Sequence, residues 1–264
     1  MRRLFLLLYL VCGSVLSLFA GGPPLIVAHR GGAGHGVENT LSCIERGVAS
    51  GADIIEVDVR MTADGHVVVC HDRDIKRTTC GKGRIDRLSL ADVRSFCVVD
   101  SEGLCTGETI PTLREVLGLV AGRCAVLIEV KGDVKGAEEA VLGDIVACDA
   151  VGWVSVQSFS DAVLGRFVEL GVPFPLEKLL YFKVPLLPLL FDGSLRCFSY
   201  GKYAHVSSFN FHKSFFCRRV AKGVKSAGKG VKVWTYGVPS SKTINSEIDA
   251  VITDFPALWS NVLR

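Results

Sequence analysis

The stretch DIIEVDVRMTADGHVVVCHD, from Asp53 to Asp72, decides the fold and carries the first polar groups of a site. Glu56 and Asp58 are two residues apart in a strand-like run, so both carboxylates project from one face while apolar side chains occupy the other. Asp64-Gly65 is typical of a tight turn, and the apolar run that follows it ends at His71. Because two acids on one strand face require a cation or a proton, the stretch predicts metal-binding acids beside a titratable base.

The pairing of these two runs determines how Asp58 and His71 face each other. A two-residue hairpin centred on Asp64-Gly65 would place Asp58 directly opposite His71. A closed barrel would instead require parallel strands, with the chain between them doubling back. In both arrangements we expect the two residues at one rim of the sheet.

The amino terminus has the charged, apolar and small-residue order of a secretory signal peptide. Arg2 and Arg3 precede an apolar run from Leu4 to Ala20, which is followed by Gly21–Pro24. We interpret residues 1–22 as a signal peptide or an uncleaved signal anchor. The protein is therefore expected to be exported, as a periplasmic, secreted or membrane-anchored chain.

The charge balance bears on the partners. Without Arg2 and Arg3 the 30 basic residues fall to 28, against 27 acidic ones, which argues against a nucleic-acid partner. The basic run from Lys213 to Lys232 is typical of a solvated helix face, and contact with an anionic membrane surface is the alternative. The oligomeric state is left open.

Short apolar runs alternate with helical patterns along residues 23–264 and predict an α/β fold, a (β/α)8 TIM-type barrel. Strands are expected at Pro24–Ala28, around Glu56, and at Cys124–Lys131, Trp153–Val156, Val172–Phe174, Ala204–Phe209, Gly230–Tyr236 and Ile248–Thr253. Helices are expected from Asn39 or Thr40 to Gly51, around Ser89–Phe96, from Ile110 through Val120, at Asp161–Leu170 and near Phe215–Ala227. In such a barrel the active site lies at the carboxyl ends of the strands.

A polar, irregular segment at about residues 74–107 interrupts this alternation, and we interpret it as a small insertion after the strand that bears His71. Cys80, Cys97 and Cys105 lie in it. Free thiols are the preferred interpretation of these cysteines, and one disulfide is the alternative if the compartment is oxidising.

Two further polar clusters end buried strands. His29 and Arg30 close the first strand and are followed by four glycines within six residues, which is typical of a loop that approaches a phosphate. Glu129 and Lys131 share one face of a later strand, so Glu129 provides a third acid in a position similar to that of Glu56.

Motifs over nearly the whole chain after the leader resemble those of the glycerophosphodiester phosphodiesterase family. They are His29-Arg30-Gly31, Glu38-Asn39-Thr40, Glu56-x-Asp58, Thr62-x-Asp64-Gly65, His71-Asp72, Arg77-Thr78-Thr79, Ile110-Pro111-Thr112-Leu113, Glu129-x-Lys131, Ser158-Phe159, Trp234-Thr235 and Thr253-Asp254-x-Pro256. The resemblance implies a TIM-type barrel with a small insertion after the second histidine. It also implies that three acids, Glu56, Asp58 and Glu129, bind one divalent cation, Ca²⁺ or Mg²⁺.

The same resemblance implies roles for the remaining polar residues. His29 and His71 would be the acid–base pair, Arg30 would hold the phosphate, and Lys131 would add positive charge beside it. The chain departs from the family pattern at Val37, at Tyr236-Gly237 and in the apolar segment Leu179–Phe191. That segment is interpreted as a barrel element, with an apolar lip for an acyl chain as the alternative.

The expected function is metal-dependent hydrolysis of glycerophosphodiesters to glycerol 3-phosphate and an alcohol. Hydrolysis of lysophospholipids and a catalytically silent, exported binding protein are the alternatives. A phospholipase of the phosphoinositide or sphingomyelinase type on the same barrel would release mainly a cyclic phosphate. The individual residues also have structural interpretations: Glu56 and Asp58 as a solvated strand face, His71 as a strand-end cap, and His29 as a structural histidine.

Overall fold

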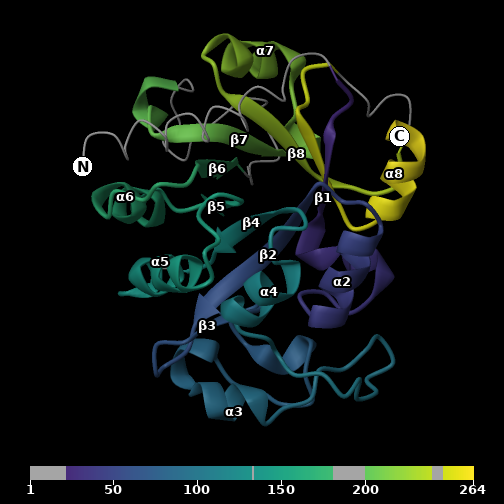
Figure 1. Ribbon diagram of the computed structural model, residues 1–264, viewed down its shortest axis with the longest axis vertical. Coiled ribbons are helices and arrows are strands. Elements are labelled where there is room, and N and C mark those ends of the chain that lie inside the picture. The colour runs from purple at the N-terminus through teal and green to yellow at the C-terminus, as the bar shows by residue number, and fades with distance from the viewer. Residues whose placement is uncertain (1–21, 133, 181–199, 240–245) are drawn as a thin grey trace.

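The computed structural model describes residues 22–132, 134–180, 200–239 and 246–264. In these residues eight parallel strands close into a barrel in the order β1-β9-β8-β7-β6-β5-β4-β2, with β2 pairing back to β1 (Figure 1). The strands are β1 Leu25–Ala28, β2 Ile54–Met61, β4 Ala125–Val130, β5 Val154–Ser158, β6 Leu176–Leu180, β7 Val206–His212, β8 Gly230–Tyr236 and β9 Ala250–Thr253. The predicted (β/α)8 TIM-type barrel is confirmed.

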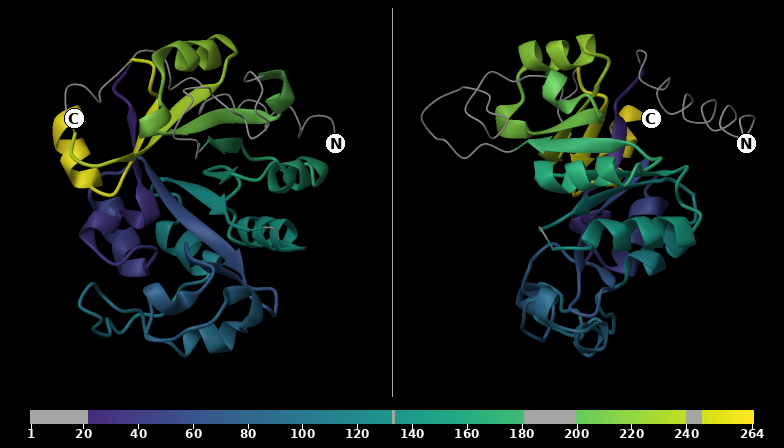
Figure 2. Two further views of the ribbon diagram at one scale, coloured as in Figure 1. Left: turned by 180° about the vertical axis from the view of Figure 1, so that it is seen from behind. Right: turned by 90° about the vertical axis from the view of Figure 1, so that its left-hand side faces the viewer.

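Helices cover the outside of the strands, as the further views show (Figure 2). They are α2 Leu41–Ala49, α4 Leu113–Val120, α5 Ala137–Ala147, α6 Asp161–Glu169, α7 Arg218–Ser226 and α8 Pro256–Leu263. No helix in the described ranges is long and apolar enough to cross a membrane. The predicted leader at residues 1–22 lies almost entirely outside those ranges.

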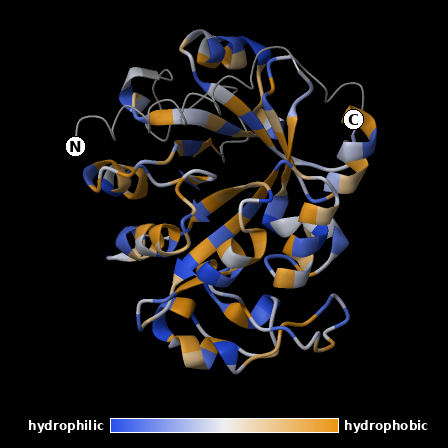
Figure 3. Cartoon of the chain, in the orientation of Figure 1, coloured by the Kyte–Doolittle hydropathy of each residue, from blue (hydrophilic) through white to orange (hydrophobic). Residues whose placement is uncertain are grey.

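Side chains along β2 point alternately to the outside and to the inside of the barrel wall. Ile55, Val57 and Val59 belong to the large core between strands and helices, whereas Ile54 belongs to a smaller cluster inside the barrel. Because successive side chains alternate, Glu56 and Asp58 lie on the same inward face as Ile54. Hydrophobic residues accordingly run along the strands, with hydrophilic ones at intervals (Figure 3).

The pairing around the Asp64-Gly65 turn differs from both expectations. The run after the turn forms β3 (Val67–Val69), which pairs antiparallel to β2 and continues the sheet beyond the closed barrel, so the parallel alternative is wrong. The hairpin register is also wrong by one residue, because Val59 pairs with Val69. The Cys70 amide therefore donates to the Asp58 carbonyl at 2.8 Å, and Cys70 takes the position expected for His71.

The segment after β3 forms a lobe at the lower end of the molecule in Figure 1. It contains the short helical turns η4 Ile75–Arg77 and η5 Ile85–Arg87 and the helix α3 Leu90–Arg94. Its own hydrophobic cluster includes Ile75, Ile85, Val93 and Val98, and Val37 packs against that cluster.

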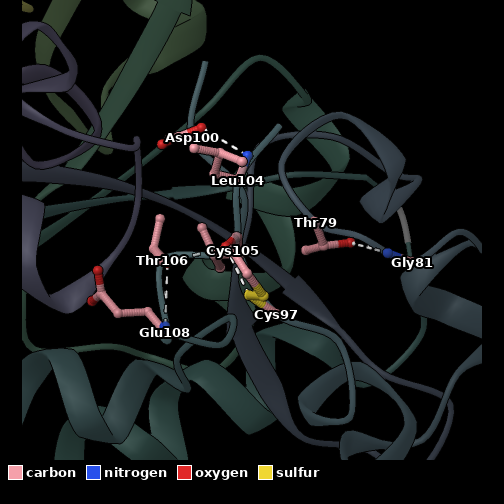
Figure 4. The surroundings of a disulfide bond; sticks show 9 residues. Thr79, Gly81, Cys97, Asp100, Leu104, Cys105, Thr106 and Glu108 are labelled. Carbon is pink, nitrogen blue, oxygen red and sulfur yellow. Dashed lines mark hydrogen bonds between the residues drawn. A yellow bond between two sulfur atoms is a disulfide. The ribbon is translucent and has the colours of Figure 1, made fainter. Parts of the chain in front are cut away.

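Cys97 and Cys105 form a disulfide in this lobe, so the preferred interpretation of free thiols is wrong for this pair (Figure 4). The disulfide closes a short hairpin whose turn is held by Asp100, because its Oδ1 accepts hydrogen bonds from the Glu102 and Leu104 amides, both at 2.9 Å. Cys80 remains a free, exposed thiol.

The fifth barrel strand, β6, lies later in the chain than expected. The strand predicted at Val172–Phe174 is wrong, because β6 begins at Leu176. Glu177 and Lys178 interrupt the apolar pattern of β6, yet both are buried and paired, with Lys232 and Asp161 respectively. The apolar segment Leu179–Phe191 contributes its first two residues to β6, and the remainder falls outside the described residues.

Contact between α2 and the loop after β1 leaves no room for a side chain at Gly47. A Cβ added at Gly47 would collide with the carbonyl oxygen of Gly31. The contact fixes α2 against the loop that carries His29 and Arg30, where Gly31 and Gly32 have φ values of 84° and 96°.

Replacement of Gly47 by alanine is expected to lower the free energy of unfolding by about 1–3 kcal/mol, because helix and loop must separate. Gly118→Ala is the matched control, since Gly118 lies in α4 with no atom within 4 Å of an added Cβ. It should raise stability by about 0.5–1 kcal/mol. Urea unfolding followed by circular dichroism measures both changes, and equal effects of the two substitutions would contradict the contact.

Candidate active site

Three carboxylates converge inside the barrel at the carboxyl ends of two neighbouring strands. β2 pairs in parallel with β4, and the register places Asp58 beside Glu129. Ligand oxygens of Glu56, Asp58 and Glu129 all lie within 4.8 Å of one another. All three residues are buried, so the interpretation of Glu56 and Asp58 as a solvated strand face is wrong.

Two basic side chains offset part of this negative charge. Lys131 Nζ lies 2.6 Å from Glu129 Oε1 and 3.1 Å from Asp58 Oδ1. Arg30 Nε lies 3.4 Å from Asp58 Oδ2. Asn39 fixes the Asp58 side chain, since its Nδ2 donates to Asp58 Oδ2 at 2.9 Å.

The charges remain unbalanced in favour of the acids. Burial, reinforced by the Asp58 charge, raises the pKa of Glu56 to about 6. Burial, opposed by Lys131 and reinforced by Asp58, raises the pKa of Glu129 to about 8. Burial also opposes ionisation of Asp58, but Lys131 and Arg30 outweigh it and hold the pKa of Asp58 well below its ordinary value. Two of the three acids thus lack sufficient positive charge nearby.

The donor set suits a hard divalent cation such as Ca²⁺ or Mg²⁺, which prefers carboxylate oxygens. Asp58 Oδ1 is buried and accepts no hydrogen bond among the described residues, despite its proximity to Lys131. Arg30 Nε is likewise buried and donates no hydrogen bond to any of the described residues. The site therefore combines a carboxylate oxygen and a guanidinium nitrogen that have ion-pair neighbours but no hydrogen bond among the described residues.

Each predicted histidine is bonded to an aspartate. His29 Nδ1 lies 2.7 Å from Asp254 Oδ1, and His71 Nδ1 lies 2.7 Å from Asp72 Oδ1. Burial alone would lower the pKa of His29, but the hydrogen bond to Asp254 and the charge of Glu56 outweigh it, and the pKa is raised. Burial dominates at His71, whose pKa is lowered.

One cavity of about 110 Å³ brings the predicted groups together. It is lined by His29, Arg30, Glu56, His71, Glu129, Lys131, Gln157, Phe159, Leu179, Trp234 and Ile252. All seven predicted site residues thus line the cavity or, in the case of Asp58, belong to the acid cluster in its wall. Tyr236, a departure from the family pattern, is not among the lining residues and lies 5.8 Å from the ring of Trp259.

Several residues that hold the site had no predicted role. Glu38 accepts from Arg30 at 2.9 Å and from Arg77 at 2.6 and 2.9 Å, and Arg77 also donates to Asp72 at 2.5 Å. Arg77 thereby links the element that carries Arg30 to the one that carries His71. The position of Arg77 in the Arg77-Thr78-Thr79 motif indicated a role at the site. Local sequence does not, however, identify the hydrogen-bond partners of Arg77 or of Asp254.

The barrel, the acid cluster and the paired histidines define a phosphodiester hydrolase of the TIM-barrel class. Residues 29–258 match the model of the glycerophosphoryl diester phosphodiesterase family. A glycerophosphodiester phosphodiesterase of Caldanaerobacter subterraneus is 32% identical over 249 residues, covering 91% of this chain and 98% of the relative. The chain belongs to this family.

Solved structures agree with the fold. A phosphodiesterase of Oleispira antarctica, in complex with the product sn-glycerol-3-phosphate, superposes with a TM-score of 0.75 at 25% identity, covering 91% of this chain and 97% of that one. A glycerophosphodiester phosphodiesterase of Thermotoga maritima gives a TM-score of 0.73 at 23% identity, covering 92% and 99%.

Proposed function

We propose that this protein hydrolyses glycerophosphodiesters to glycerol 3-phosphate and an alcohol, with one divalent cation held by Glu56, Asp58 and Glu129. The observation that carries the proposal is the cluster of three buried carboxylates, whose ligand oxygens lie within 4.8 Å of one another in the wall of the site that also contains both histidines. Among the described residues, Asp58 Oδ1 and Arg30 Nε form ion pairs there but no hydrogen bond. The glycerol 3-phosphate in the related Oleispira structure supports the product.

When bound, the cation supplies positive charge that polarises the phosphoryl group. Arg30 and Lys131 stabilise the negative charge that develops on the phosphoryl oxygens, and one such donor in a dry site contributes about 3 kcal/mol. Arg30 is held for this role by Glu38, while its Nε lies near Asp58 and makes no hydrogen bond to the described residues. Phe159, Trp234 and Leu179 provide an apolar wall that limits access of water to the phosphate.

The two histidines differ in the direction of their pKa shifts, which suggests a division of labour. His29, with its raised pKa, remains protonated to higher pH and is assigned as the acid that protonates the leaving alcohol oxygen. His71, with its lowered pKa, remains neutral to lower pH and is assigned as the base that removes a proton from the nucleophile. Asp254 and Asp72 orient the two rings through Nδ1.

Phosphorus NMR of the products from glycerophosphocholine tests the reaction. Glycerol 3-phosphate should appear, its formation should stop with chelator, and excess Ca²⁺ or Mg²⁺ should restore it. A cyclic phosphate as the main product, or full turnover after chelation, would contradict the mechanism. Faster cleavage of lysophosphatidylcholine than of glycerophosphocholine would overturn the substrate assignment.

The pH dependence of kcat/KM tests the histidine roles. Activity should fall at low pH as His71 becomes protonated, with the midpoint below 6.5, and at high pH as His29 loses its proton, with the midpoint above 6.5. Asp254→Asn replaces the carboxylate whose charge and charge-assisted hydrogen bond raise the pKa of His29 by a neutral amide, so the alkaline midpoint should move to lower pH while the acid midpoint stays in place.

Alanine at His29 or His71 should lower kcat about 10²- to 10⁴-fold with the fold retained, as judged by circular dichroism. In the pH profile of Asp254→Asn, a shift of the acid midpoint instead of the alkaline midpoint would reverse the assignment of His29 as acid and His71 as base. Undiminished turnover in either alanine variant would remove that histidine from the mechanism.

Export is proposed from the leader, and the Cys97–Cys105 disulfide supports it because such bonds persist mainly in oxidising compartments. Mass spectrometry of the chain recovered from its native cell decides the matter. An exported chain that begins near residue 22 indicates a cleaved signal peptide, and a full-length chain in the membrane fraction indicates an anchor. A full-length chain in the cytosol would contradict export.

A further inference from the structure

A chain of buried polar side chains crosses the interior of the barrel and ends at Glu56. Its members come from five strands and are Lys232 (β8), Glu177 (β6), Asn210 (β7), Gln157 (β5) and Glu56 (β2). Each is at most 5% exposed, so water does not satisfy these groups in place of the protein.

The contacts are continuous from one end to the other. Lys232 Nζ lies 2.6 and 2.7 Å from the two carboxylate oxygens of Glu177. Asn210 Nδ2 donates to Glu177 Oε2 at 2.9 Å and to Gln157 Oε1 at 2.7 Å. Gln157 Nε2 then donates to Glu56 Oε1 at 3.2 Å.

The chemistry of each group gives this chain a single direction. Lys232 has only donors, so Glu177 accepts from it and from Asn210. Asn210 therefore presents its amide nitrogen to Glu177 and Gln157, while its oxygen accepts from Ser208 Oγ at 3.0 Å. Because the oxygen of Gln157 faces Asn210, its nitrogen must face Glu56.

Glu56 is thereby held from two sides. Its Oε1 receives the Gln157 amide, and its Oε2 receives the Arg30 backbone amide at 2.9 Å. A carboxylate has about four acceptor positions, so each oxygen retains one that a cation held with Asp58 and Glu129 would use. The two donors restrict rotation of the carboxylate plane.

Packing does not account for these residues. TIM-barrel interiors are commonly filled with layers of branched apolar side chains. Replacing a buried ion pair by apolar residues is often neutral or stabilising, so Glu177 and Lys232 are not explained by stability. The polar chain does, however, determine which atom of Gln157 meets Glu56.

We propose that Gln157 is a positioning residue for the metal ligand Glu56, and that the Lys232–Glu177–Asn210 network fixes the orientation of the Gln157 amide. The inference rests on the proposed function in taking Glu56 as a ligand. It adds a role for four buried residues that contribute no ligand atom and do not react with substrate.

Replacement of Gln157 by methionine keeps the length of the side chain and removes its hydrogen bonds. The variant should bind Ca²⁺ or Mg²⁺ about 10- to 100-fold more weakly than the unsubstituted protein, as measured by calorimetric titration of the metal alone. The kcat of the variant should fall, and saturating metal should largely restore it, because Gln157 positions a ligand and takes no part in proton transfer.

Ser158→Ala is the matched control. Ser158 is the next residue of β5, is equally buried, and bonds to the Val130 carbonyl outside the polar chain. Its metal affinity should stay within about twofold of the unsubstituted protein, a difference small beside the change expected from an outer-shell substitution. Affinity within the same range in Gln157→Met would overturn the proposal.

Asn210→Leu provides a second test if Gln157→Met does not fold. It removes the donor that holds the Gln157 oxygen and should also weaken metal binding, and unchanged affinity would overturn the role of the network.

Glu56→Gln distinguishes failure of the proposed metal site from failure of the proposed role of Gln157. Retained metal affinity in Glu56→Gln would refute the metal site itself, whereas lost affinity there with normal affinity in Gln157→Met would refute only the positioning role.

Discussion

Mutual repulsion among the three buried carboxylates is the constraint on which the rest of the site depends. The parallel register of β2 and β4 sets Asp58 beside Glu129, with Glu56 two residues earlier on the same inward face. Repulsion of this kind is strong in a region of low dielectric constant. Burial, together with the charges of Asp58 and Glu56, raises the pKa of Glu129 to about 8, because Lys131 offsets only part of these effects.

Barrel closure supplies what these two strands lack. β1 pairs with β2 and brings His29 and Arg30 from the start of the chain, while Asp254 follows β9 at its end and holds the His29 ring. Arg30 adopts a left-handed backbone with φ of 51°, and its amide donates to Glu56. The strained loop is therefore tied directly to the acid cluster that it serves.

Local sequence patterns predicted the elements of this arrangement well. Alternation in β2 identified Glu56 and Asp58 as one face, and buried strand patterns with polar ends predicted the barrel. The register after Asp64-Gly65 was wrong by one residue, since Ala63 joins the loop and the Thr62 amide donates to the His66 carbonyl. A turn motif such as Asp-Gly predicts that a hairpin forms more reliably than it predicts how many residues the hairpin loop contains.

The failures share a physical cause, which is that burial of a charged residue depends on distant partners. Glu177 and Lys178 gave β6 a polar pattern, and the Lys232 that neutralises Glu177 lies 55 residues later. The carboxylate that orients His29 is 225 residues away from it, and Gln157 is 101 residues from Glu56. No local period contains such information, so these contacts required the closed fold.

The barrel interior is divided between two kinds of packing. An apolar cluster of Val27, Ile54, Leu127, Ala250 and Ile252 comes from β9, β1, β2 and β4, which are neighbours in the barrel. The polar chain comes from β5 to β8, the other half, and reaches the apolar half only at Glu56 of β2. The strands that carry His29 and the acids thus rest on a dry apolar support, where close packing limits their movement. In the opposite half, buried polar side chains replace that apolar packing, and their hydrogen bonds orient the Gln157 amide nitrogen toward Glu56. Rigidity of the ligand strands and orientation of one ligand thereby arise from different halves of one closed sheet.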